Sequence, residues 1–349
     1  MESLDDGDIR ISTFDMTKGV RATFTPSSLE RHGKYIINAQ RLYQTLRVLP
    51  ESEITFDINE KLNCTLSAGK AMFSMFATPG ADFPTLPELI TDSGFSIPSS
   101  TIKRMIGKVF HSIAVQDNRV CLTGALFNIE DNKIDVVSCD SFTFSKCSAV
   151  CDINSITASD VKYSFIIPGA SLTELMKILP DDDDYKAEFY ITRKHAIIKC
   201  DDVIFFTRTI DSEYIDYNRF VPQDNDIFIK VDREMLLSGL ERANLIADEK
   251  TNGNGRSYVK VGIDHKYLSL SSNSVNGNVS DEMECEHTGD AIEIAFNCRY
   301  FINTVRVLDG DMIEISFKSP TKPIILRSVE KEENFDCFFM IVPTRMREA

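Results

Sequence analysis

The sequence contains the same helical segment three times, at nearly constant spacing. The copies occupy residues 38–50, 168–180 and 297–309, and each carries apolar residues at helical intervals. Position 180 follows position 50 by 130 residues, and position 309 follows position 180 by 129 residues. Because self-similarity at a fixed period indicates tandem copies of one structural unit, we predict three domains of the same fold.

The elements around each copy repeat as well. Each helix follows a predicted strand, at residues 35–37, 165–167 and 292–296. Each helix precedes a strand whose apolar residues alternate, at residues 54–58, 187–191 and 313–317. Alternation at period two is typical of a half-buried strand. The repeat therefore combines helices with antiparallel strands, and the predicted fold class is α+β.

A second amphipathic helix opens the central and last copies, at residues 99–110 and 232–242. In the central copy its apolar residues recur at i, i+3, i+4 and i+7, so they share one face. In the last copy, Asp232 stands where an N-cap residue is expected. The strand at residues 134–138 that follows this helix has counterparts at residues 268–272 and 9–13.

This register sets the predicted domain boundaries, which are residues 1–93, 94–222 and 223–349. Counting back one repeat length from residue 94 places the start of the first copy about 30 residues before Met1. Its first helix and first strands are therefore expected to be missing from the sequence. A start site assigned too late or a shortened chain explains this, and a genuine loss in this lineage is the alternative.

Charge restricts the kind of nucleic-acid contact that the chain can make. Lys and Arg number 38 against 53 Asp and Glu, which gives a formal charge of −15. Such a surplus of acid excludes a protein that coats itself with nucleic acid through bulk attraction. On the repeated helices, however, Arg47, Lys177 and Arg306 all point away from the apolar face. A solvated face would explain one such residue, but the recurrence predicts a positive lining that contacts phosphates without reading sequence.

The nine cysteines are scattered and include no C-x-x-C pair. We predict that all are reduced thiols, including Cys147 and Cys151, because a zinc site would need further ligands nearby. No signal peptide and no apolar stretch of about 20 residues is present, so we expect a cytoplasmic protein without a membrane span.

Catalytic motifs are absent from the sequence. The five histidines are dispersed without an H-E-x-x-H pattern, Gly69-Lys70 lacks the upstream glycine of a phosphate-binding loop, and no G-x-S-x-G occurs. The run at residues 181–184 consists of four aspartates, but consecutive residues of a turn cannot converge on one metal ion. We therefore expect no enzymatic activity, no cofactor and no metal.

Four short runs carry a resemblance to a known family. They lie at residues 83–87 (FPTLP), 216–222 (DYNRFVP), 295–300 (AFNCRY) and 342–345 (VPTR). In order and spacing they resemble the bacterial sliding clamp, the beta subunit of DNA polymerase III. The resemblance implies three tandem copies of the DNA-clamp fold, with helices lining a hole and antiparallel sheets outside. It further implies a ring-shaped homodimer that encircles duplex DNA and tethers a polymerase.

The resemblance also implies a groove that binds short peptides of the replicative polymerase, the clamp loader and repair polymerases. Its residues here would be Leu122, Phe142, Thr143, Phe144, Ile215, Arg219, Phe220, Thr321, Pro323, Met340, Ile341, Val342, Pro343, Thr344 and Arg345. The chain departs from the commoner pattern in two places. Residues 140–144 read Asp-Ser-Phe-Thr-Phe where the family usually has an Asp-Gly turn followed by His-Arg-Leu, and Ile215 replaces a usual proline. We expect a changed peptide preference, and a longer tail from residue 346 that narrows the groove.

Two further sets of residues complete the prediction. The side chains expected to face DNA are Arg47, Lys103, Arg104, Lys108, Gln116, Arg119, Lys177, Arg242 and Arg306; Gln116 and Arg119 come from the resemblance. The resemblance implies a dimer interface made by Phe73 and Met75 on one side and by Leu245 and Ile246 on the other. The competing hypothesis is a divergent clamp-like protein that binds partner peptides without encircling DNA, because its first domain cannot complete its sheet.

Overall fold

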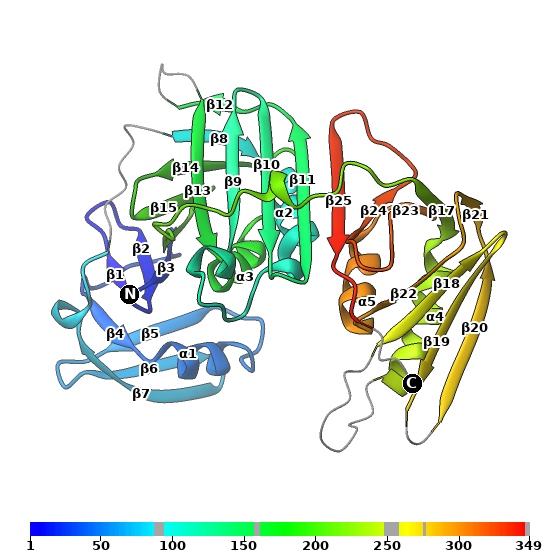
Figure 1. The fold of residues 1–349 in the computed structure, drawn as a ribbon. Coiled ribbons are helices and arrows are strands. Elements are labelled where there is room, and N and C mark those ends of the chain that lie inside the picture. The colour runs from blue at the N-terminus through cyan, green and yellow to red at the C-terminus, as the bar shows by residue number, and fades with distance from the viewer. Residues whose placement is uncertain (87–93, 157–160, 248–257, 275–276, 346–349) are drawn as a thin grey trace. The chain divides into compact units, whose positions relative to one another are not determined.

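The computed structural model describes residues 1–86, 94–156, 161–247, 258–274 and 277–345. Figure 1 shows its helices and strands as a ribbon. The chain divides into two compact units. The first comprises residues 1–94 and 187–208, and the second comprises residues 95–186 and 209–349. No helix within the described residues is long and apolar enough to cross a lipid bilayer.

The first unit contains two antiparallel sheets and one described helix. Its N-terminal elements are β1 (Glu2–Ser3), β2 (Ile9–Phe14), β3 (Lys18–Phe24), β4 (Tyr35–Ile37), α1 (Ala39–Leu46), β5 (Ile54–Ile58), β6 (Asn63–Ala68) and β7 (Ala71–Pro79). Strands β14 (Lys186–Ile191), β15 (His195–Cys200) and β16 (Val203–Arg208) complete it. One sheet runs β1-β2-β3-β16-β15-β14, and the other has the order β4-β7-β6-β5.

The second unit contains most of the central copy and the whole last copy of the repeat. The central elements are β8 (Gly94–Pro98), α2 (Ser99–Val109), β9 (Gly124–Glu130), β10 (Lys133–Cys139), β11 (Thr143–Val150), β12 (Asn154–Ser155), β13 (Lys162–Pro168) and α3 (Gly169–Ile178). The last copy holds β17 (Ile227–Asp232), α4 (Arg233–Ala247), β18 (Val259–Asp264), β19 (Tyr267–Asn273), β20 (Asn278–Glu284), β21 (Glu286–Thr288), β22 (Ile292–Phe296), α5 (Cys298–Val307), β23 (Met312–Phe317), β24 (Ile324–Ser328) and β25 (Phe335–Ile341).

One nine-stranded sheet joins these two copies. Its order is β13-β9-β10-β11-β25-β24-β23-β17-β21, so the central copy contributes four strands and the last copy contributes five. The two sets meet where β11 pairs with β25, from Thr143 opposite Ile341 to Ala149 opposite Phe335. A separate sheet, β20-β19-β18-β22, belongs to the last copy alone. We call the β11–β25 pairing the strand join.

The repeated helices start for identifiable local reasons. The Asn38 side chain accepts a hydrogen bond from the Arg41 N–H, and Asn297, at the matching position of the last copy, accepts from Arg299 and Tyr300. Asp232 caps α4 as predicted, since its carboxylate accepts from the Met235 N–H at 2.7 Å. Helix α4 runs to Ala247, five residues past its predicted end at residue 242. This extension places Leu245 and Ile246 on its final turn.

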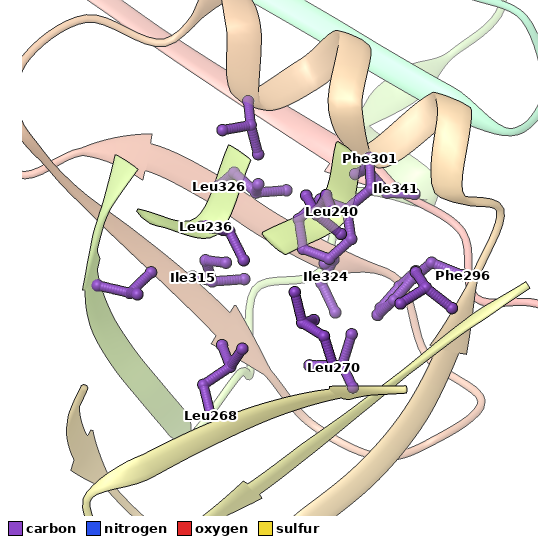
Figure 2. Packing of buried hydrophobic residues seen from close by; sticks show 14 of the residues in the cluster. Leu236, Leu240, Leu268, Leu270, Phe296, Phe301, Ile315, Ile324, Leu326 and Ile341 are labelled. Atoms are coloured by element: carbon purple, nitrogen blue, oxygen red, sulfur yellow. The ribbon is translucent and has the colours of Figure 1, made fainter. Parts of the chain in front are cut away.

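Core packing differs between the copies. In the last copy, side chains from α4, α5 and both sheets converge on one cluster, which includes Leu240, Leu270, Phe301 and Ile315 (Figure 2). Burying each such side chain contributes about 1.5–3 kcal/mol. Helix α4 packs there against α5. In α1, by contrast, only Thr45 is buried. The first copy has a single α-helix within residues 1–86, so the apolar face of α1 has no neighbouring α-helix among the described residues of its unit.

The prediction that every cysteine is a free thiol is wrong for two of them. Cys147 of β11 and Cys337 of β25 form a disulfide, with their Cα atoms 4.2 Å apart. The two residues stand 190 positions apart and belong to different copies of the repeat, so no local spacing signals the pair. The other seven cysteines, Cys151 among them, are not disulfide-bonded.

Candidate functional site

The predicted groove has an apolar floor at the strand join. Leu122, Phe144 and Met340 are buried in one cluster, and Ile215 and Val342 pack against its edge. The register of β11 and β25 sets Phe144 directly opposite Met340. Because these three side chains are enclosed, they shape the groove from beneath and expose little surface to a ligand.

Phe220 provides the exposed aromatic side chain of this floor. Its ring meets the Phe144 ring edge-on, with centroids 5.8 Å apart, and 36% of the residue remains exposed. Phe220 follows a short 3-10 helix at Tyr217–Arg219. Arg219 points into solvent and binds the Asp216 carboxylate at 2.8 Å. Phe220 therefore presents apolar surface that an incoming apolar side chain can contact.

The turn before β11 forms one wall. The Asp140 carboxylate accepts hydrogen bonds from the N–H groups of Phe142 and Thr143, at 2.9 and 2.6 Å, and from the Thr143 hydroxyl. Burial raises the pKa of Asp140, and these hydrogen bonds oppose that rise. Ser141 has φ +78°, a left-handed conformation that favours glycine. This turn exposes the Phe142 ring, which stacks on Tyr300 with centroids 5.5 Å apart and an interplanar angle of 15°.

A pocket of about 590 Å³ opens beside this stack. Its lining residues are Phe142, Asn244, Ala247, Asn297, Cys298, Arg299, Tyr300, Val342, Pro343, Thr344 and Arg345. The segment after β25 crosses it, since the Val342 N–H donates to the Phe142 carbonyl at 2.8 Å and the Thr344 N–H donates to the Ala295 carbonyl at 2.7 Å. The central and last copies therefore both supply its walls.

The structure brings most of the predicted groove residues together and adds others. Thr143 and Ile341 face each other at the end of the strand join and are buried. Thr321 and Pro323 lie on the loop before β24, whose first residue, Ile324, pairs with Ile341. Sequence reasoning missed Asn244, which α4 brings to the pocket; Asn297 and Tyr300 lay within a run that carried the family resemblance. The predicted narrowing by the tail from residue 346 lies outside the described residues.

Two of the basic side chains predicted to face DNA are bound elsewhere. Arg104 of α2 binds Glu332 and Asp309, each at 2.8 Å, and lies over the Phe335 ring at 3.9 Å. Lys108 binds Asp309 at 2.5 Å, and its side chain is only 12% exposed. Burial would raise the pKa of Asp309, but the hydrogen bonds from Lys108 and Arg104 lower it. Through these ion pairs, Arg104 and Lys108 attach α2 to the last copy.

The other predicted DNA-facing side chains lie at the surface. Arg47 at the end of α1 is exposed over the Tyr43 ring, and Lys103 of α2 is half-exposed. Lys177 pairs with Glu174, Arg242 with Asp281, and Arg306 with Glu241. Gln116 is exposed, whereas Arg119 binds Asp117 and the Ser141 hydroxyl. Exposed ion pairs contribute little net stability, so these side chains can exchange a carboxylate for a phosphate at low cost.

The predicted interface residues divide between core and surface. Met75 is 5% exposed and packs with Cys64 and Leu66 in the core of the first copy, so its side chain has little surface to offer a second subunit. Phe73 is partly exposed on the same strand, where β4 pairs only with residues 77–79 and leaves the edge beside Phe73 open. On α4, Leu245 is 74% exposed and Ile246 is half-buried.

Models of the three domains of the DNA polymerase III beta subunit match this chain in order. The N-terminal domain matches residues 3–87, the central domain matches residues 96–216, and the C-terminal domain matches residues 218–345. The chain belongs to the DNA polymerase III beta subunit family. It is accordingly a non-catalytic subunit, in agreement with the absence of catalytic motifs from its sequence.

Individual relatives of the beta subunit family extend over nearly the whole chain. The beta sliding clamp of Bacillus subtilis is 28% identical over 334 residues, which are 94% of this chain and 84% of that protein. The crystal structure of the Bacillus subtilis DNA polymerase sliding clamp has a TM-score of 0.87 at 24% identity, covering 99% of this chain and 90% of that one. The beta subunit from Thermotoga maritima gives 0.88 at 22% identity, with the same coverage. These structures share the fold of this chain.

A buried histidine lies where the central and last copies of the repeat meet. His111 follows α2, and its Nε2 atom lies 3.3 Å from the Thr304 hydroxyl of α5 and 3.5 Å from the Ser145 hydroxyl of β11. Its ring also contacts Phe339 of β25. Burial lowers the pKa of His111 to about 4, and the Lys108 carbonyl opposes this only weakly. The histidine is therefore neutral at physiological pH.

Acid should destabilise the protein through His111. Its pKa is about 4 in the folded chain and about 6.5 when exposed, so between these values the unfolded chain binds the proton more readily. We expect this residue to remove about 3 kcal/mol of stability as the pH falls from 6.5 to 4. Urea unfolding of the native chain and of His111→Gln at several pH values measures this effect. Equal losses of stability in both proteins would contradict the prediction.

The Ser141 turn offers a second test. Relative to Ser141→Ala, which keeps the left-handed strain, Ser141→Gly should be more stable by about 1 kcal/mol. Both variants lack the hydroxyl that binds Arg119, so their difference isolates the backbone conformation. Chemical denaturation monitored by circular dichroism compares them. A glycine variant no more stable than the alanine variant would show that this φ angle carries no strain.

Proposed function

We propose that this chain acts as a DNA sliding clamp, a ring-forming homodimer that encircles duplex DNA and tethers the replicative polymerase and repair polymerases. The observation that carries the proposal is the groove at the strand join of a three-domain beta subunit. A closed ring retains DNA by topology, so it needs no tight contact with the duplex. The tethered polymerase stays at high effective concentration and rebinds the primer end before it diffuses away.

For DNA, we assign the positive lining to Arg47, Lys103, Lys177, Arg242 and Arg306, joined by Gln116 and Arg119 of the loop after α2. Arg104 and Lys108 are left out, because their charges are committed to Asp309 and Glu332. The side chains of Lys177, Arg242 and Arg306 are each more than half exposed, so their ion pairs contribute little stability and can exchange with phosphate. Contacts of this kind are salt-sensitive and sequence-blind, which suits a protein that moves along the duplex.

For partner proteins, we assign recognition to the exposed part of the groove. Ile215, Phe220, Phe142 and the segment 342–345 would contact the peptide, with Arg219, Thr321 and Pro323 at the rim. Leu122, Thr143, Phe144, Met340 and Ile341 form the floor. An apolar surface with few polar groups suits a short segment with apolar side chains and one hydrogen-bonding residue, such as those of polymerases and the clamp loader.

For assembly, we propose that the edge of β7 around Phe73 meets Leu245 and Ile246 of a second copy. An unpaired apolar edge strand invites aggregation unless a partner covers it, and two identical head-to-tail contacts would close a dimer. We further propose that the protein works in the cytoplasm, where replication proceeds. The alternative is a clamp-like protein that binds peptides without encircling DNA. Retention on circular DNA compared with linear DNA distinguishes the two functions.

Phe220→Ala should weaken binding of a labelled polymerase-derived peptide by at least tenfold, because truncating a half-exposed aromatic anchor removes the main apolar contact. Phe228→Ala is the matched control, since Phe228 is 37% exposed and lies on β17, in contact with β21 and β23. Fluorescence anisotropy measures both affinities. Equal affinities for the two variants would place the peptide elsewhere.

If the protein encircles DNA, its retention should depend on whether the DNA is circular or linear. Loaded onto nicked circular DNA by a clamp loader with ATP, the labelled protein should stay bound through gel filtration and be released when the circle is cut. Single-molecule or column assays before and after linearisation measure its retention. Release at the same rate from circular and linear DNA would favour the peptide-binding alternative.

A further inference from the structure

The strand join contains a covalent bond as well as hydrogen bonds. Cys147 and Cys337 stand directly opposite each other in the antiparallel register of β11 and β25, and their sulfur atoms are bonded. Among the described residues, no other disulfide is present. The bond therefore cross-links the central copy of the repeat to the last copy, whose remaining contacts are noncovalent.

The position of this bond ties it to the groove. The pair Ser145 and Phe339 lies two positions along the join on the same face, next to His111. The pair Phe144 and Met340 lies three positions along, on the opposite face, and forms the groove floor. A slip of one residue between the strands would exchange the two faces. A cross-link at 147 and 337 prevents such a slip.

The two sulfurs differ in access. Cys147 is completely buried, whereas Cys337 is partly exposed at the edge of the last copy's core. A small thiol or disulfide would therefore react at Cys337. The partly exposed free cysteines are poor competitors, because burial raises the pKa of the Cys151 thiol to about 11 and also raises that of Cys285.

We propose that the Cys147–Cys337 bond is a reversible redox staple, which holds the strand join in register when oxidised and loosens the join and the groove above it when reduced. The effect on the groove rests on the proposed peptide-binding function. The effect on the join does not.

The chemistry needs a low-molecular-weight disulfide as oxidant. The Cys337 thiolate attacks one sulfur of that disulfide, forms a mixed disulfide and releases one small thiol. The Cys147 thiolate then attacks the Cys337 sulfur and releases the second small thiol. The two cysteines lose two electrons and two protons, and both leaving thiolates take up the protons. A small dithiol reverses the exchange and is itself oxidised to a cyclic disulfide.

The cross-link is tested by mapping thiols in the full chain. The protein is treated with iodoacetamide directly, after dithiothreitol, and after reduction followed by oxidised glutathione, and is then digested for mass spectrometry. We expect the peptides containing Cys147 and Cys337 to be joined after glutathione treatment and alkylated separately after dithiothreitol, while Cys151 is never joined to either. Separate alkylation of both cysteines after oxidised glutathione would overturn the proposal.

The consequences are tested by thermal melting and peptide binding. Reduction should lower the melting temperature of the native chain by about 5–10 °C and weaken peptide binding several-fold. Cys337→Ser and Cys147→Ala should not respond to reductant, whereas Cys151→Ser should respond like the native chain. A native melting temperature unaffected by reduction overturns the staple, and unchanged peptide affinity despite a lower melting temperature overturns its control of the groove. Failure to bind peptide in either redox state, with melting still redox-dependent, instead rejects the proposed groove.

Discussion

The pairing of β11 with β25 is the interaction on which the second unit depends. It merges strands of two repeats into one nine-stranded sheet and sets Phe144 opposite Met340. Because successive residues of a strand point to opposite faces, one register places Phe144 and Met340 on one face and the His111 contacts on the other. Side chains from α2 reinforce the same junction, where Arg104 and Lys108 bind Asp309. Backbone pairing, ion pairs and a disulfide thus all connect the central copy to the last copy.

The distribution of charge follows from this architecture. The chain carries a surplus of acid, and several of its basic side chains are held by acidic neighbours. At the junction of the two copies, Lys108 is largely buried and Arg104 binds two carboxylates. Lys177, Arg242 and Arg306 are each more than half exposed and bind one carboxylate. This arrangement leaves a modest number of cations for phosphate, which favours loose contact with a duplex over tight binding.

Much of the fold was predictable because each weak local pattern of apolar residues occurs three times, once in each copy of the repeat. The helices at 38–50, 168–180 and 297–309 and the strands on either side of them are confirmed as α1, α3, α5 and their neighbours. The errors concern tertiary partners. Periodicity places Arg104 and Lys108 on a polar face, but it cannot indicate that Asp309, about 200 residues away, lies opposite them. For the same reason, periodicity could not indicate that Cys147 and Cys337, 190 positions apart, form a disulfide.

The burial of Met75 could not be predicted from the sequence for a different reason. A strand with Met72, Phe73, Met75 and Phe76 is apolar on both faces, so alternation alone does not say which face meets the core. The structure turns Met75 and Ala77 inward and leaves Met72 and Phe76 exposed. In the groove, the family resemblance supplied residues such as Phe142 and Val342, while Asn244 required the longer α4 that the structure reveals.

The composition of the pocket has a consequence for synthesis of the protein. Phe142 lies in the central copy, whereas Tyr300 and the segment 342–345 come from the end of the chain. The cavity therefore forms only after residues of both copies have been synthesised and have folded against each other.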